Sequence, residues 1–188
     1  MKGALAISKD PKRGAIAAGM GFTNPNSMSM HIAFDFDCPN YAYFAKWKPS
    51  LPLFAKFQIC AIVREVATFD SEEEYYANRP YKLIEKGEAL VNSGISSQFF
   101  GTQEFMKPKD EETKTEAIFV GHVIKTEKKI NELTGQSFYW ALIETAGGME
   151  LDVVIHTKFI EEGGIKPPKV GGILRGYGWL SGKLLSVL

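Results

Sequence analysis

The sequence predicts a mostly β protein whose carboxyl-terminal part closes into a small β-barrel. Residues 116–188 hold short stretches in which apolar and polar residues alternate, and glycine-containing turns separate these stretches. Weaker strand patterns occur earlier in the chain, and one segment carries a clear signal for the start of a helix. We therefore expect an antiparallel β region at the amino terminus, the barrel at the carboxyl terminus, and one or two short helices.

The composition is that of an ordinary globular protein with no excess of charge. The chain has 188 residues, of which 45% are hydrophobic and 23% are charged, so it can bury an ordered core without metals or disulfides. Lysine plus arginine equals aspartate plus glutamate, at 22 each. Tight, sequence-independent binding to duplex DNA depends on neutralising phosphates with basic side chains, so this balance counts against that function but leaves room for a local basic patch.

Cysteine usage and hydropathy exclude several other classes. Cys38 and Cys60 are widely spaced and form no CxxC motif, so no zinc site, other metal site or cofactor is expected. The apolar stretch near Met1 is too short for a secretory signal, and no run approaches the roughly 20 apolar residues that cross a membrane. We expect a cytoplasmic protein with no membrane partner.

Four strand patterns precede residue 71, at 4–8, 14–23, 27–37 and 55–70. The last is the clearest, because apolar residues at 57, 59, 61 and 63 share one face and charged residues fall on the other. Ile62 and Val66 break this alternation, which predicts that the strand is covered on both sides over part of its length.

A short helix follows this strand. Ser71 and Glu74 have the spacing of a capping box, so the helix begins at Ser71, and Pro80 ends it. The polar stretch 107–115 then predicts a linker between an amino-terminal β-rich region, 1–106, and the barrel, 116–188. The alternative is one intertwined β structure with no boundary there.

The carboxyl-terminal pattern gives an order of elements. Strands are predicted at 116–130, with Gly121 placing a bend or bulge in the middle, at 137–145 and at 149–156, joined by turns at 131–135 and 146–148. A connector follows, which Pro167 and Pro168 prevent from continuing as a helix, and then the glycine-rich closing strands.

Three strands as a meander, a connector and one or two closing strands resemble the OB-fold, a five-stranded barrel that binds oligonucleotides or oligosaccharides. The runs NELTGQSF, GGMELDVV and GGILRGYGWLSGKL are also similar to small uncharacterised prokaryotic proteins with OB-like barrels. The resemblance covers 116–188 and implies a binding face on strands and loops. Its fifth strand would have to be 183–188, unless the amino-terminal half supplies a strand instead.

Aromatic and basic residues interleave at 40–49. Flat rings bind nucleic-acid bases by stacking, at about 1–3 kcal/mol per base, and lysines attract phosphates. The more common arrangement is a half-buried aromatic strand whose lysines only reach solvent. The candidate ligand-binding residues here are Tyr41, Tyr43, Lys46, Trp47 and Lys48.

A second candidate strip lies in the last predicted strand. Arg175, Tyr177 and Trp179 alternate along the strand and therefore share one face, where they can stack on a ligand. The alternative is structural, because aromatic side chains often cover glycine backbones, and glycines flank these residues.

No catalytic signature is present. Asp35 and Asp37 share a strand face but have no third ligand or acid at motif spacing, and Ser181 lacks the G-x-S-x-G context of a nucleophile. We expect a non-catalytic binding module for single-stranded nucleic acid or another extended polymer. The alternative is a protein-interaction or assembly subunit that oligomerises through apolar strand faces. An enzyme would need a pocket assembled from distant segments.

Overall fold

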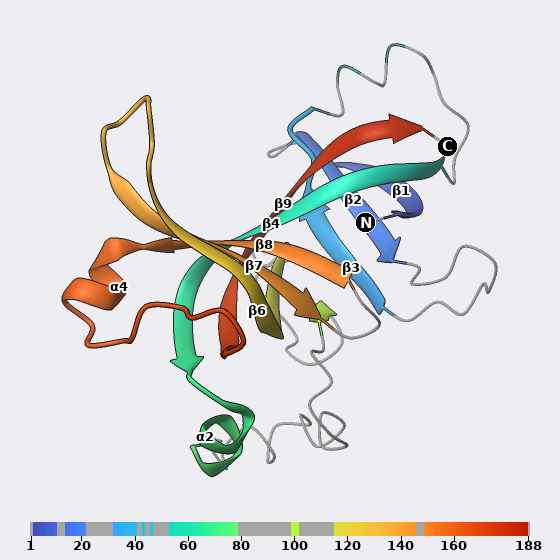
Figure 1. Ribbon diagram of the computed structural model, residues 1–188. Helices are drawn as coiled ribbons and strands as arrows, with labels where there is room; N and C mark the ends of the chain where they lie inside the picture. The colour runs from blue at the N-terminus through green and yellow to red at the C-terminus, as the bar shows by residue number, and fades with distance from the viewer. Residues whose placement is uncertain are drawn as a thin grey trace.

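The computed structural model describes residues 2–10, 14–21, 32–40, 43, 46, 53–78, 99–101, 115–145 and 149–187 (Figure 1). Within this part of the chain, nine strands join in one sheet beside two short helices, so the predicted mostly β class is confirmed. The strands are β1 (Lys2–Asp10), β2 (Gly14–Gly21), β3 (Ile32–Asp37), β4 (Leu53–Phe69), β5 (Phe99–Gly101), β6 (Glu116–Ile130), β7 (Ser137–Thr145), β8 (Met149–His156) and β9 (Ile173–Val187). The helices are α2 (Glu72–Ala77) and α4 (Thr157–Glu161).

Two long strands, β4 and β9, run side by side through the middle of the molecule (Figure 1, teal and red). They pair antiparallel from Ala55 opposite Val187 to Phe69 opposite Ile173. Each also pairs with other strands along its outer edge, so the sheet closes on itself twice. The result is two rings of strands that share β4 and β9.

The carboxyl-terminal ring consists of β4, β8, β7, β6 and β9, each hydrogen-bonded to the next. The strands β6, β7 and β8 form the predicted meander, and β8 lies parallel to β4. A closed ring of five strands is the arrangement of a small β-barrel. A register shift between Val123 and Lys125 bends β6 just after Gly121, where a Cβ would lie 2.6 Å from the Glu144 carbonyl oxygen.

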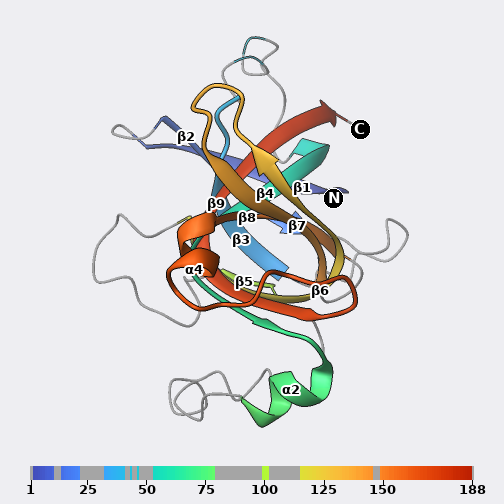
Figure 2. The same cartoon turned by 60° about the vertical axis from the view of Figure 1, so that its left-hand side comes forward.

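The amino-terminal ring consists of β4, β1, β2, β3 and β9, and in Figure 2 it lies behind the carboxyl-terminal ring. It closes through one bridge, Asp37 opposite Ser181. Beyond that bridge the Asn40 side chain replaces a strand: its Nδ2 donates to the Leu184 carbonyl at 2.8 Å, and its Oδ1 accepts from the Leu184 N–H at 3.0 Å. The two rings thus differ in how completely β9 is paired.

The predicted separate fifth strand at 183–188 is wrong. One unbroken strand, β9, extends to Val187, and β4 occupies the position between β8 and β9 that closes the carboxyl-terminal ring. This agrees with the alternative in which the amino-terminal half supplies a strand. The domain division at 107–115 stays a prediction, and residues 107–114 lie outside the described part of the chain.

One core of buried apolar side chains runs through both rings. In the amino-terminal ring, the Phe36 ring covers Gly182, where a Cβ would lie 2.2 Å from Phe36 Cδ2. In the carboxyl-terminal ring, Phe119 covers Gly176, where a Cβ would lie 2.5 Å from Phe119 Cζ. The glycines of β9 therefore make room for two of the largest core side chains.

The predicted alternation of buried and outward residues along β4 continues as far as the bulge after Val63. Residues 57, 59, 61 and 63 face the core as predicted. A register shift between Val63 and Glu65 then changes the phase, so that Val66 packs against the core. At Ile62 the strand is not covered on both sides, because this residue is 42% exposed on the outer face.

Helix α2 begins where the sequence predicted. The Ser71 side chain accepts a hydrogen bond from the Glu74 N–H, and acidic residues fill the first turn. Its one buried residue, Tyr75, packs edge-on against Phe69 and against Val120 of β6. The helix therefore lies against the end of the carboxyl-terminal ring.

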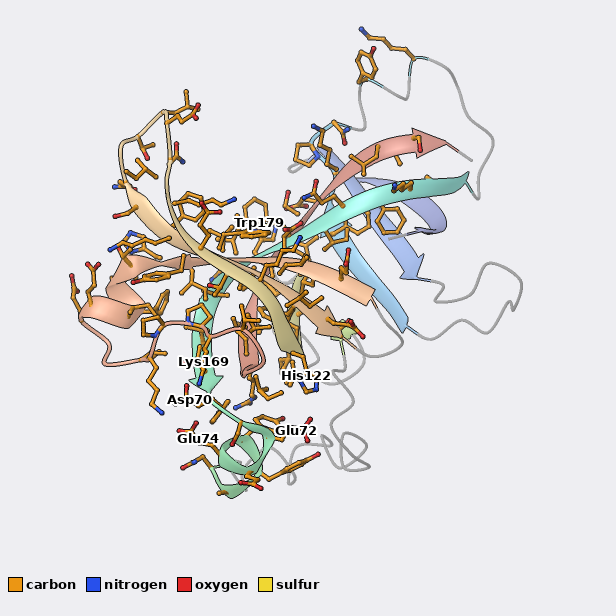
Figure 3. All side chains as sticks on the ribbon, in the orientation of Figure 1. Asp70, Glu72, Glu74, His122, Lys169 and Trp179 are labelled. Carbon is orange, nitrogen blue, oxygen red and sulfur yellow. The ribbon has the colours of Figure 1, made fainter. Side chains whose placement is uncertain are left out.

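Charged side chains lie between this helix, β6 and the connector before β9, and Figure 3 labels Asp70, Glu72, Glu74 and His122 among them. Lys166 Nζ lies 2.9 Å from Asp70 and 3.0 Å from Glu74, and the Lys166 hydrogen bond lowers the pKa of Asp70. Glu72 lies 3.6 Å from His122. These side chains are partly or largely exposed, so each contact contributes little to stability, and Lys166 neutralises only one of the two carboxylates that it contacts.

Candidate functional site

An apolar row crosses the outer face of the carboxyl-terminal ring. Trp140 of β7 lies opposite Val154 of β8. Val154 lies opposite Ile62 of β4, which lies opposite Trp179 of β9. Neighbouring strands are about 4.8 Å apart, so these four positions span about 14 Å. We call these four residues the tryptophan row.

All four side chains point away from the core, because strand residues alternate between faces. The residues next to them, Ala141, Val153, Ala61 and Leu180, are buried at 0% exposure. Ile62 is well exposed, and the other three members are half-buried. The row is therefore a continuous apolar strip at the surface.

At one end of the row, the Trp140 indole is held by a fully paired carboxylate. Trp140 Nε1 donates to Asp152 Oδ1 at 2.7 Å, and Gln58 Nε2 donates to Asp152 Oδ2 at 2.7 Å. The ammonium of Lys129 lies 4.2 Å from the centre of the Trp140 ring, as a cation–π pair. Both the edge and one face of this indole are thus in use.

At the other end, the Trp179 indole is held by a carboxylate that is only half paired. Trp179 Nε1 donates to Asp37 Oδ2 at 2.5 Å across the junction of the two rings. Asp37 Oδ1 is shielded from solvent and has no hydrogen-bond partner among the residues that the structure describes. Figure 3 shows Trp179 near the middle of the molecule.

A buried acid lies beside Trp179. Glu116 of β6 lies opposite Trp179 and is only 4% exposed. It accepts a hydrogen bond from the Tyr177 hydroxyl, and Arg64 Nη2 lies 2.9 Å from its Oε1. Burial, reinforced by the Glu116 contact, raises the pKa of Tyr177 to about 12. The Arg64 side chain is 67% exposed, so most of its donors face solvent.

The charges around the row are mixed. Carboxylates hold both indoles, and Arg64 is paired with Glu116, the acid opposite Trp179. Such a surface attracts phosphates only weakly, because each cation has an acid beside it. Binding here would depend on the flat and apolar side chains.

The structure brings together the three predicted residues of β9. Arg175, Tyr177 and Trp179 are half-buried on one outer face, with buried Gly176 and Gly178 between them. Two of the three give their polar atoms to carboxylates, which sequence reasoning did not foresee. Their role in binding stays a prediction.

Only part of the aromatic run at 40–49 can be placed. Tyr43 is 62% exposed, and Lys46 is exposed. Tyr41, Trp47 and Lys48 lie outside the described residues. The expected binding role of this run stays a prediction.

Sequence reasoning missed the residues that hold and extend the row: Gln58, Ile62, Arg64, Glu116, Asp152 and Val154. The signal was incomplete, because alternation assigns each side chain to a face but gives no register between strands. Asp37 was considered only with Asp35 as a metal or acid pair, and its partner is 142 residues away.

Reactive groups are scarce in the part of the chain that the structure describes. Cys60 lies beside Asp152, and burial followed by that charge raises its pKa to about 12, which keeps the thiol protonated and unreactive. No group of three or more His, Cys, Asp or Glu residues suited to a metal ion occurs among the described residues. The arrangement can bind a ligand by stacking and hydrogen bonding.

Comparison with known proteins adds no assignment. No family model, no curated protein and no solved structure matches the chain. Among the described residues, none of the helices has the length and apolar character needed to span a membrane.

Proposed function

We propose that the protein is a non-catalytic binding module whose ligand lies across the tryptophan row. The observation that carries this is the pair of indoles at the two ends of the row, each held by a carboxylate on another strand. A side chain fixed in this way loses little conformational freedom on binding, so its stacking energy is retained. The first ligand to test is single-stranded nucleic acid, and another extended polymer with flat groups fits the same face.

We further infer that the carboxyl-terminal ring is an OB-like barrel whose fifth strand is β4. What supports this is the order of its elements: a meander of β6, β7 and β8, the connector with α4, and the closing strand β9. Barrels of this kind bind ligands on the face of their second and third strands. Here those strands are β7 and β8, which carry Trp140 and Val154 of the row.

Titration with labelled, unstructured oligonucleotides at low salt tests the proposal. Replacing Trp140 or Trp179 by alanine should weaken binding by about tenfold, since one stacked base contributes about 1–3 kcal/mol. Val170→Ala is the matched control, because Val170 is 59% exposed in the connector and lies outside the row. If the unmodified protein changes neither the anisotropy nor the mobility of any oligonucleotide, nucleic acid is removed as the ligand.

A second candidate function is that of an assembly subunit, in which the row packs on a copy of the chain or on another protein. The observation that favours it is the centre of the row, where Ile62 and Val154 offer apolar surface without aromatic rings. Interface centres are apolar and their strongest contacts are often tryptophans.

Sedimentation at several concentrations separates the two functions. An assembly subunit that pairs with itself should dimerise, and Ile62→Asp should return it to a monomer. Leu133→Asp is the control, since Leu133 is 96% exposed at the tip of the β6–β7 hairpin and is not part of the row. A strict monomer with no co-purifying protein argues against assembly.

A further inference from the structure

The geometry points to the Trp179 end of the row as a site for flat rings that carry an amino group, such as cytosine in single-stranded nucleic acid. This rests on the proposed function and adds to it the chemical class of ring that the site prefers. The residue that makes the choice is Asp37, which touches Trp179 across the junction of the two rings.

Two carboxylates hold the two indoles, and within the described part of the chain Asp37 is the one of these two that has an oxygen without a donor. Asp152 accepts from Trp140 through one oxygen and from Gln58 through the other. Asp37 accepts from Trp179 through Oδ2, and its Oδ1 is buried with no donor. A buried acceptor without a partner is unfavourable, so a ligand that supplies a donor there is stabilised relative to one that does not.

An ionised carboxylate only accepts hydrogen bonds, so it selects between rings by their edges. Cytosine carries the N4 amino donor at the position where uracil carries the O4 acceptor. The cytosine and uracil bases are otherwise nearly the same in size, and both can stack on an indole. A carboxylate that faces the exocyclic position therefore accepts from cytosine N4 and repels uracil O4, and uracil can donate to it only through the neighbouring N3–H, while stacking alone would treat the two bases alike.

Arg64, which is paired with the acid opposite Trp179, offers a contact for a phosphate. Arg64 is fixed by Glu116 at 2.9 Å and keeps most of its N–H donors in solvent. Along β9, Ser181 lies opposite Asp37, and Glu116 lies opposite Trp179 itself. A nucleotide stacked on Trp179 would thus turn its base edge toward Asp37 and its phosphate toward Arg64.

Access to Asp37 Oδ1 requires a side-chain movement, because this oxygen is closed to solvent in the ligand-free molecule. The contact that must adjust is the hydrogen bond between Trp179 Nε1 and Asp37 Oδ2. Rotation of a partly exposed side chain is fast compared with binding. The amino group of the ligand then takes up the acceptor that the free protein leaves unpaired.

The test compares labelled oligodeoxycytidine and oligodeoxyuridine of equal length, by anisotropy at low salt and slightly alkaline pH. The unmodified protein should bind the cytosine strand about tenfold more tightly, which corresponds to about 1.4 kcal/mol. Asp37→Asn should abolish or reverse this ratio, because an asparagine amide can donate to uracil O4. Asp152→Asn removes the same charge from the other end of the row and should leave the ratio unchanged, even if both strands bind more weakly.

Each outcome has one meaning once circular dichroism shows that the variants are folded. A tenfold ratio that only Asp37→Asn changes supports the assignment. Equal binding of both strands by the unmodified protein overturns it and leaves the proposed function standing. A ratio that depends on Asp152 rather than Asp37 also overturns it. Binding of neither strand removes the nucleic-acid function itself.

Discussion

At each end of the tryptophan row a carboxylate accepts a hydrogen bond from an indole, but the two carboxylates differ in how many of their oxygens have a donor. At the Trp140 end, Asp152 lies where β8 meets β4 through three residue pairs, and it has a donor on each oxygen. At the Trp179 end, Asp37 lies where β3 meets β9 through a single bridge, and one of its oxygens has no donor. A carboxylate can thus hold an indole with a donor on each of its oxygens at one site, and with a donor on one oxygen alone at another.

The largest effect should come from a steric clash between the backbones of β4 and β9 at the Trp179 end. A Cβ at Gly178, beside Trp179, would lie 2.3 Å from the Ile62 carbonyl oxygen, so Gly178→Ala forces β4 and β9 apart. We expect the free energy of unfolding to fall by about 3 kcal/mol in urea denaturation. The matched change at the other end, Ala141→Gly beside Trp140, should lower it by about 1 kcal/mol. If both substitutions lowered the free energy of unfolding equally, β4 and β9 would be able to move apart at Gly178 without further loss of stability.

The next effect concerns the acid opposite each tryptophan, because Glu116 opposite Trp179 is buried and Glu127 opposite Trp140 is exposed. Arg64→Ala leaves the buried Glu116 carboxylate with the Tyr177 hydroxyl alone, and should lower the free energy of unfolding by about 2 kcal/mol. Glu116→Gln keeps an acceptor for Tyr177 and removes the buried charge, so it should lower it by less than about 1 kcal/mol. Thermal denaturation compares the two variants. A larger loss of stability for Glu116→Gln than for Arg64→Ala would mean that Arg64 does not serve chiefly to neutralise Glu116.

A smaller effect compares the two carboxylates directly. Asp152→Asn presents an amide N–H to either the Trp140 or the Gln58 donor, and should lower the free energy of unfolding by about 1–2 kcal/mol. Asp37→Asn can place its amide nitrogen at the unpaired Oδ1 position, so its effect should stay within about 0.5 kcal/mol. Chemical denaturation checks both, and a larger loss for Asp37→Asn would contradict the assigned difference in pairing.

The last effect vanishes at neutral pH, because it consists of two alkaline titrations, one near each end of the row. The pKa of Cys60 is raised from 9.0 to about 12 and that of Tyr177 from 10.0 to about 12. Between the unfolded and folded values only the folded state keeps the proton, so stability falls as the pH rises from about 9 for Cys60 and from about 10 for Tyr177. Cys60→Ala should remove the earlier loss and Tyr177→Phe the later one, as unfolding at several pH values will show.

The elements were largely predictable because each has a local cause. The strand 137–145, the turn with Gly135 at φ 69°, and the helix capped by Ser71 all follow from alternation, glycine and a capping box. The closing of the carboxyl-terminal ring did not follow, because it depends on β4 pairing with strands about a hundred residues later in the chain. Alternation gives no information on which strands become neighbours.

Alternation between faces follows from the chain alone, so Trp140, Val154, Ile62 and Trp179 each lie on the face opposite to that of their immediate neighbours. The pairing of distant strands in the folded molecule aligns these four residues and places Asp152 and Asp37 at the two ends of the row. The physical reason is that the face of a side chain is set by its immediate neighbours along the chain. Its partners across the sheet are set by hydrogen-bond registers between distant strands, which form only when the whole core is packed.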